Sequence, residues 1–284
     1  MKWLEILISL IRIRIKNRRE FAVIRKTYRL ARKVMRDQNN GLMWDESNNY
    51  SKVLIVFLVK NVHRLQSITL LCKRGLAKDA VPLLRGMFEE FIDLRYMSVN
   101  KTRVQDFIDY DIYQRYKIGR ILINKKDEGI DKNRVTTRNE ALKCEWEKIK
   151  HRFTYKTKNR KEKVYKRWTR GDVRQICNEI GLGDMYDYLF SYLSIYIHSN
   201  PITINDFVLG RKGNNIVLEI GASPTLVPEV LATSSGIYLD MLRIADKDFE
   251  MGLDKMIKPV EDILKNAGEA RKKQRKSVSK NTNI

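Results

Sequence analysis

Apolar residues recur at helical spacing through most of the 284-residue chain. The first segment shows the pattern clearly, because one helix face would carry the aliphatic residues Leu4, Leu7, Ile8, Ile11 and Ile15. Strand-like patterning is confined to residues 206–221, where two short apolar runs flank a turn rich in Gly and Asn. The sequence therefore predicts a mainly α-helical bundle with a small β-hairpin after the helix that ends at His198.

Helix-ending residues divide the chain into three expected parts. Residues 1–48 read as a basic amphipathic helix followed by a loop, in which Asn39-Asn40-Gly41 stops the helix. Residues 49–267 read as a helical bundle domain with a basic insertion at about 148–170. Residues 268–284 are basic and poor in aliphatic side chains, so we expect a disordered tail there.

The formal net charge of +22 is concentrated in three segments. Residues 1–36 and 148–170 each carry a net charge of +10, and residues 271–280 carry +6, so the rest of the chain carries −4. Such clustering is typical of proteins that bind a polyanion, either nucleic acid or an anionic membrane surface. Solvated helix faces and a disordered tail would give the same pattern, and both interpretations stay open.

The basic insertion also carries aromatic residues between its cations, namely Phe153, Tyr155, Tyr165 and Trp168. Cations bind phosphates, and aromatic rings stack on unpaired bases. We therefore expect nucleic acid as a partner, RNA more than DNA. The expected contact residues are Arg152, Lys156, Lys158, Arg160, Lys161, Lys166, Arg167 and Trp168.

Several functional classes find no support in the residues. Cys72, Cys144 and Cys177 have neither metal-ligand nor redox spacing, so we expect reduced core thiols and a cytoplasmic location. No glycine-rich phosphate loop, nucleophile elbow or histidine metal motif is present, and we expect no metal and no cofactor. The longest uninterrupted apolar run, Val53 to Val59, is too short to span a bilayer.

The segment from Asp184 to His198 is apolar or aromatic at nearly every position, which predicts a helix buried on most sides. Its polar exceptions are spaced 4, 3 and 4 residues apart and should share one face: Asp187, Ser191, Ser194 and His198. One interpretation is a site in which His198 acts as acid or base beside Ser194. The alternative is a core network in which His198 caps the helix.

Arg85 and Glu89 lie four residues apart on an otherwise apolar helix. A buried charge pair loses hydration and seldom recovers that free energy as stability, so such a pair is retained for function or for fold specificity. The alternative is a partly exposed pair on the helix face.

These motifs, taken in order, resemble an uncharacterised bacterial family. They are Leu84-Arg85-x-x-x-Glu89, Tyr96, Arg103-x-x-x-Phe107-x-x-Tyr110, Trp168, and Tyr192 followed by Ser194 and His198. The family is a domain of unknown function, all-helical and common in mobile or defence-associated gene neighbourhoods. The resemblance covers about residues 50–250 and brings no activity with it.

The arrangement is also similar to the HEPN superfamily, helical bundles that include dimeric ribonucleases of toxins and defence systems. Their active sites have four to six residues between an arginine and a histidine, and no arginine precedes His63, His151 or His198 at this spacing. Arg85 would then supply the cation from a neighbouring helix while His198 activates a ribose 2′-hydroxyl. The resemblance makes the candidate catalytic set His198, Arg85, Glu89 and Ser194.

Three functions stay open at this point. The first is an RNA-directed effector or toxin of a bacterial defence system. The second is a non-catalytic binding or regulatory module in which the same Arg, Glu, Ser and His residues form a structural network. The third is peripheral membrane association through residues 1–36. The same segment would alternatively pack on the bundle or on a second copy in a homodimer.

Overall fold

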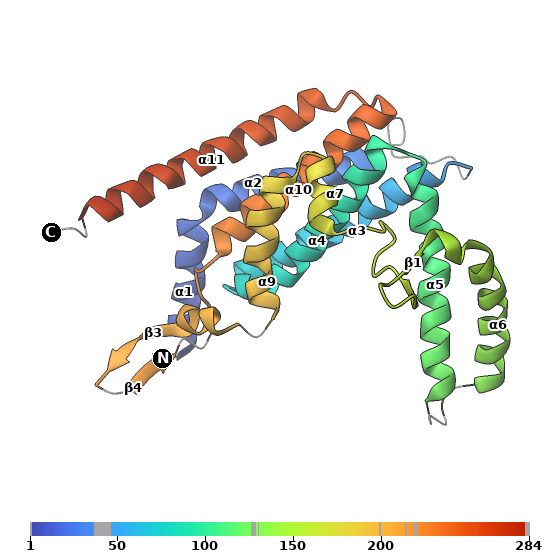
Figure 1. Cartoon of the computed structure of the whole chain (residues 1–284). Helices are drawn as coiled ribbons and strands as arrows, with labels where there is room; N and C mark the ends of the chain where they lie inside the picture. The colour runs from blue at the N-terminus through green and yellow to red at the C-terminus, as the bar shows by residue number, and fades with distance from the viewer. Residues whose placement is uncertain are drawn as a thin grey trace. The chain divides into compact units, whose positions relative to one another are not determined.

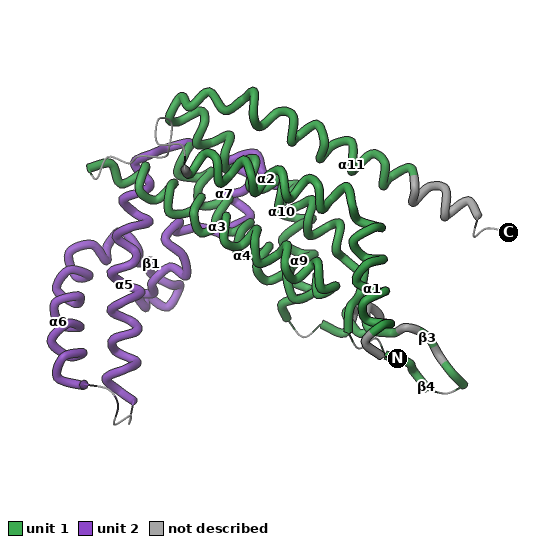
Figure 2. The backbone as a smooth tube through the Cα atoms, turned by 180° about the vertical axis from the view of Figure 1, so that it is seen from behind, with its two compact units in different colours: residues 1–98, 184–284 green, residues 99–183 purple. Residues whose placement is uncertain are grey.

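The computed structural model describes residues 2–36, 47–125, 129, 131–198, 200–213, 215–218 and 221–281. It divides into two compact units, unit 1 (residues 1–98 and 184–284) and unit 2 (residues 99–183), which Figure 2 colours separately. The mainly α-helical fold predicted from the sequence is confirmed. The expected stop at Asn39-Asn40-Gly41 lies outside the described residues.

Unit 1 holds the four longest described helices, and two of its elements reach one residue past its limits. In chain order its elements are α1 (Lys2–Lys16), α2 (Arg18–Arg36), α3 (Asn49–Lys73), α4 (Ala77–Val99), α8 (Gly183–Met185), the π-helical turn η2 (Tyr186–Phe190), α9 (Ser191–Ile197), the 3-10 helix η3 (Pro201–Phe207), β3 (Val208–Lys212), β4 (Asn215–Leu218), α10 (Val227–Phe249) and α11 (Asp254–Asn281).

The core of unit 1 forms where α10 packs against α2, α3 and α11 (Figure 1). Tyr238 of α10 is fully buried, and its hydroxyl donates to the carbonyl of Leu58 in α3 at 3.4 Å. Within the described part of the chain, α3 has the length and composition to cross a membrane, but half of its most apolar stretch is buried in unit 1. Buried core helices share this length and composition.

The turn between α3 and α4 requires glycine. Gly75 has a φ of +72°, a conformation that side-chain-bearing residues rarely adopt. Its carbonyl accepts a hydrogen bond from the Ser223 amide at 2.9 Å. A Cβ at this position would lie 2.8 Å from atoms of Ala222 and of Ile13. The missing side chain therefore lets α1 and the segment after β4 meet at this turn.

The single helix expected over the first 37 residues is two helices, because the chain changes direction at Asn17 (Figure 1). The buried Asn17 side chain donates to the carbonyl of Ile13 at 2.8 Å. In α2 the apolar face is buried, and Val23 and Ile24 are fully enclosed. In α1, by contrast, Ile13 is buried while the predicted apolar face is exposed.

The tail expected to be disordered from Gly268 onward is instead part of α11, which continues to Asn281. Ala267 is buried, and the Nη1 atom of Arg271 lies 3.2 Å from a carboxylate oxygen of Glu20 in α2. Composition predicted disorder because this segment lacks aliphatic residues, but Glu20 of α2 supplies an ion-pair partner for Arg271. Residues 282–284 lie outside the described residues.

The helix expected from Asp184 to His198 is interrupted by the π-helical turn η2 and is less buried than predicted. Leu189 and Leu193 are buried, whereas Tyr188 is 75% exposed. A π turn inserts an extra residue and changes which side chains share a face. The hairpin predicted after His198 is confirmed, because β3 and β4 pair antiparallel.

Unit 2 is built around aromatic side chains. Its elements are α5 (Arg103–Asn124), α6 (Lys132–Ile149), the 3-10 helix η1 (Lys150–Arg152), β1 (Thr154–Lys156), β2 (Glu162–Val164) and α7 (Val173–Glu179). The rings of Tyr110 and Phe153 lie 5.4 Å apart, and those of Phe107 and Trp168 lie 5.5 Å apart. This core is separate from that of unit 1, so the division differs from the single bundle expected over residues 49–267.

The three cysteines differ in exposure, which corrects the expectation that all are core thiols. Cys72 and Cys177 are buried, and Cys144 is exposed. Burial raises the pKa of the Cys72 thiol to about 12.

We expect a charged maleimide to label the native protein at Cys144 alone, because only a thiolate in contact with solvent reacts rapidly. Mass spectrometry after brief labelling would identify the site, and labelling in denaturant should reach all three thiols. Rapid native labelling of Cys72 would contradict the described packing of α3.

Candidate functional site

Arg85 joins α4 to the segment formed by η2 and α9. Its Nε lies 3.1 Å from the Glu89 Oε1, and its Nη1 donates to the Ser194 hydroxyl at 2.8 Å. The Ser194 hydroxyl in turn donates to the carbonyl of Phe190 at 2.7 Å, and the guanidinium carbon lies 4.2 Å from the centre of the Phe190 ring. Three of the four predicted catalytic residues therefore meet, and every polar atom that joins them already has a protein partner.

His198 does not join this group. It is exposed at the C-terminal end of α9, where its backbone amide donates to the Ser194 carbonyl at 3.2 Å. Among the described residues, no hydrogen bond or ion pair links its side chain to Arg85, Glu89 or Ser194. Asp187 and Ser191 are also exposed, so the predicted polar seam does not run along a buried helix face.

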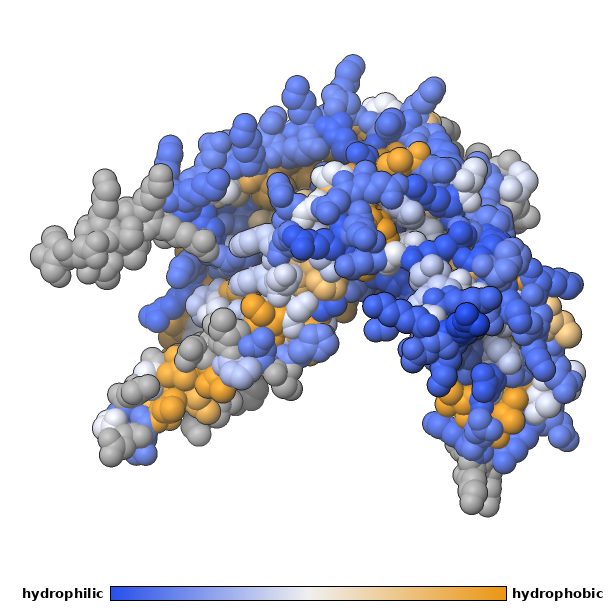
Figure 3. All heavy atoms as spheres, in the orientation of Figure 1, coloured by the Kyte–Doolittle hydropathy of each residue, from blue (hydrophilic) through white to orange (hydrophobic). Residues whose placement is uncertain are grey.

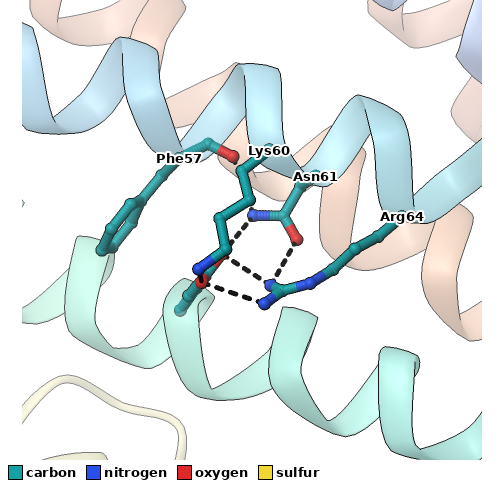
Figure 4. Close-up of polar contacts among 5 residues, drawn as sticks. Phe57, Lys60, Asn61 and Arg64 are labelled. Carbon is teal, nitrogen blue, oxygen red and sulfur yellow. Dashed lines mark hydrogen bonds and ion pairs between the residues drawn. The ribbon is translucent and has the colours of Figure 1, made fainter. Parts of the chain in front are cut away.

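A second polar network lies between α3 and α4 (Figure 4) and was not predicted from the sequence. Both carboxylate oxygens of Glu90 accept from Arg64, at 2.6 and 3.1 Å. The fully buried Asn61 side chain donates to Glu90 at 2.9 Å and to the Phe57 carbonyl at 2.8 Å, and Lys60 completes the set with an ion pair to Glu90. The sequence does contain a signal for this network, because the polar residues Lys60, Asn61 and Arg64 share one side of a largely apolar helix.

Gly86 makes room for the Arg64 guanidinium. A Cβ at Gly86 would lie 3.3 Å from the Arg64 Nη2 and 3.4 Å from its Cζ, closer than side chains normally approach. One turn of α4 therefore takes part in two networks. Arg85 and Glu89 belong to the network with α9, and Gly86 and Glu90 belong to the network with α3.

Unit 1 also contains a cavity of about 710 Å³, bordered by parts of α2, α4, α9, α10 and α11. Three tyrosines at helical spacing line it, Tyr188, Tyr192 and Tyr196. The candidate catalytic residues do not line this cavity. Within the described ranges, no group of three or more His, Cys, Asp or Glu side chains could hold a metal ion.

The basic insertion folds as a hairpin of β1 and β2 in unit 2, with an ordered turn at its tip. The Thr157 amide donates to the Lys161 carbonyl at 2.9 Å, and the Lys161 amide donates to the Thr157 hydroxyl at 3.2 Å. Around this turn, four cations predicted to contact nucleic acid are exposed and have no ion pair among the described residues: Lys156, Lys158, Arg160 and Lys161. Lys166 is also exposed and without an ion pair there, but it follows β2 and lies at the other end of the hairpin.

The other predicted contact residues hold the hairpin in place. Arg152 pairs with Asp106 and with Asp109 of α5, the latter at 2.5 Å. Trp168 is 6% exposed and packs edge-on against Phe107, so its ring is not free to stack on a base. Arg167 is half-buried. The insertion therefore divides into anchoring residues and a solvent-exposed basic tip.

A second basic surface follows α2. A groove of about 320 Å³ between α2 and α3 is lined by Arg25, Arg29, Arg32 and Lys73, without an acidic residue. Its arginines recur at helical spacing along the face of α2 opposite the core. The predicted charge cluster of residues 1–36 is therefore partly a row of arginines along this groove.

A family model described as a family of unknown function (DUF5677) matches residues 51–216, more than half of the chain. The chain belongs to the DUF5677 family. The match includes both networks of α4 and the β1–β2 hairpin, whereas α1 and α2 precede it. No curated protein and no solved structure matched the chain. The likeness of this DUF5677 member to the HEPN superfamily stays a prediction.

Replacing Arg85 with Ala should lower the free energy of unfolding by about 2 kcal/mol, because charged hydrogen bonds in a half-buried setting are lost. Urea unfolding would measure this, and a double-mutant cycle with Ser194→Ala should give a coupling of about 1 kcal/mol. A matched control is Arg115→Ala, which breaks the exposed i,i+4 pair with Asp111 and should cost less than about 0.5 kcal/mol. A stable Arg85→Ala variant that loses ribonuclease activity would instead favour the catalytic interpretation.

Gly86→Ala should fail to give the usual helix stabilisation of up to about 1 kcal/mol, because the Arg64 guanidinium is held by hydrogen bonds and cannot move aside freely. In an Arg64→Ala background the same substitution should recover that gain. Thermal or urea unfolding of the four proteins would measure both effects. Equal effects in the two backgrounds would show that Arg64 does not limit the space at Gly86.

Proposed function

We propose that this protein binds nucleic acid, RNA in preference to DNA, through the basic tip of the β1–β2 hairpin. The observation that carries the proposal is the division of charge within the insertion. Arg152 and Arg170 are neutralised by carboxylates of α5, whereas the cations at the tip face solvent. The charge of a cation that pairs with a carboxylate is already neutralised, so such a cation attracts a phosphate only weakly. An exposed cation without an ion pair binds a phosphate and releases counterions.

A preference for unpaired over duplex nucleic acid is supported by an aromatic pair on the hairpin. The rings of Tyr155 and Tyr165 lie 4.8 Å apart, and Tyr155 is 40% exposed. Such a ring offers a stacking surface that duplex DNA, whose bases are already stacked, cannot use. The arginine row of α2 in unit 1 supports the same function, because it offers further unpaired cations to a phosphate backbone.

The geometry of Arg85, Glu89 and Ser194 favours a structural role over catalysis. Catalytic cations must be available to charge that develops on a substrate. Arg85 is instead engaged by a carboxylate, a hydroxyl and an aromatic ring within unit 1. The function that we propose is therefore binding, and a ribonuclease activity in a defence or toxin system stays a prediction.

The binding proposal can be tested with a variant in which Lys156, Lys158, Arg160 and Lys161 are replaced by Ala. Its affinity for a single-stranded RNA should fall, and the slope of log affinity against log salt should decrease in magnitude by about three, because about 0.7 counterion is released per phosphate contact. Fluorescence polarisation at several salt concentrations would measure both quantities. The wild type should bind the RNA more tightly than a duplex DNA of equal length.

The matched control removes four exposed cations from another part of unit 2, namely Lys132, Arg134, Arg138 and Lys143 of α6. This variant has the same net charge as the hairpin variant and should keep the wild-type affinity more closely. Equal losses in the two variants would show that binding depends on net charge alone. A wild type with no salt-dependent binding would remove nucleic acid as the partner.

A further inference from the structure

The first helix presents an apolar face that nothing in the described structure covers. Five aliphatic side chains on this face are between 39% and 65% exposed, namely Leu4, Leu7, Ile8, Ile11 and Ile15. Their spacing places them along a single stripe of α1. Isolated exposed aliphatic residues are common, but a continuous stripe of this kind marks an interaction surface.

The outward orientation of this stripe is fixed by the opposite side of the helix. Ile13 is buried against Gly75 and the segment after β4, and Asn17 is buried at the junction with α2. These residues lie on the side of α1 that faces unit 1, so the helix cannot bury its stripe there without breaking their contacts. The partner that covers the stripe must therefore come from outside unit 1.

The same end of unit 1 carries a second group of exposed apolar side chains. In both Figure 1 and Figure 2 the β3–β4 hairpin and the start of α1 lie at this end, and Figure 3 shows hydrophobic atoms in orange at the hairpin. The exposed residues of this group are Ile204, Phe207, Ile216, Val217 and Leu218. The exposed apolar surface therefore extends beyond one helix.

The charges beside the stripe indicate whether a second copy of the chain or a lipid bilayer is the better partner for it. Arg12, Arg14 and Lys16 are exposed on α1, and Arg18 and Arg19 follow at the start of α2, whereas Glu5 is the one acid in α1. A second copy of the chain would bring another helix of net positive charge against this one. An anionic lipid bilayer offers hydrocarbon for the stripe and negative headgroups for the flanking cations.

We propose that α1 is a peripheral membrane anchor that lies in the interface of an anionic bilayer, with the β3–β4 hairpin as a second contact. The aliphatic stripe enters the headgroup–acyl boundary, and Arg12, Arg14 and Lys16 remain at the level of the lipid phosphates. Neither unit needs to span the bilayer. This anchor is independent of the nucleic-acid-binding tip in unit 2.

The test is flotation of the full chain with vesicles of phosphatidylcholine alone or mixed with anionic phosphatidylglycerol. The wild type should float with the anionic vesicles, less at high salt, and weakly with phosphatidylcholine. Leu7→Glu combined with Ile11→Glu should reduce partitioning by about tenfold or more, because two aliphatic side chains lose their transfer into lipid. Both residues are exposed, so circular dichroism and the melting temperature should stay close to those of the wild type.

The matched control is Ile118→Glu combined with Ile121→Glu, which changes two similarly exposed aliphatic residues of α5 and should leave flotation intact. Absence of wild-type flotation on anionic vesicles would overturn the proposal, and so would an equal loss in the control. Light scattering after size exclusion tests the competing occupant. A solution dimer that Leu7→Glu with Ile11→Glu converts to a monomer would show that the stripe is a protein interface instead.

Discussion

The carboxylate of Glu90 is the interaction on which the packing of α3 against α4 depends. It accepts from Arg64 through both oxygens, from the buried amide of Asn61, and from Lys60. Glu90 and Arg64 are largely shielded from solvent, with side-chain exposures of 12% and 19%. Removing Glu90 would leave the Arg64 guanidinium without its carboxylate, a loss that costs about 3–5 kcal/mol where such a pair is buried. The network thus adds to the short turn at Gly75 in fixing the register between these two apolar helices.

That register places Arg85 where α9 can reach it. Arg85 directly precedes Gly86, over which Arg64 lies, and Glu89 directly precedes Glu90. Adjacent residues on a helix point about 100° apart, so one set faces α3 and the other faces η2 and α9. The π-helical turn is the local feature that brings the Phe190 ring and the Ser194 hydroxyl toward the guanidinium. The two networks together connect three helical segments through one turn of α4.

Periodicity predicted the helices, the hairpin after His198 and the Arg85–Glu89 contact, because these depend on residues that are neighbours in sequence. It could not predict that Ser194 completes the Arg85 contacts while His198 stays outside, since the π turn changes the register between Asp187 and Ser194. Composition also does not reveal which cations of the insertion form ion pairs within unit 2. That depends on Asp106 and Asp109, which lie more than 40 residues earlier in the chain.

The helices at the start of the chain show why an apolar pattern alone does not identify a core. In α2 the apolar stripe packs on α10, whereas in α1 a stripe of the same kind faces solvent and the helix is held by Ile13 and Asn17. The sequence of α1 is equally compatible with both outcomes, because periodicity defines a face and not its partner. The turn at Gly75 decides between them. Ile13 and Ala222 both pack beside Gly75, and the stripe on the opposite side of α1 therefore faces outward.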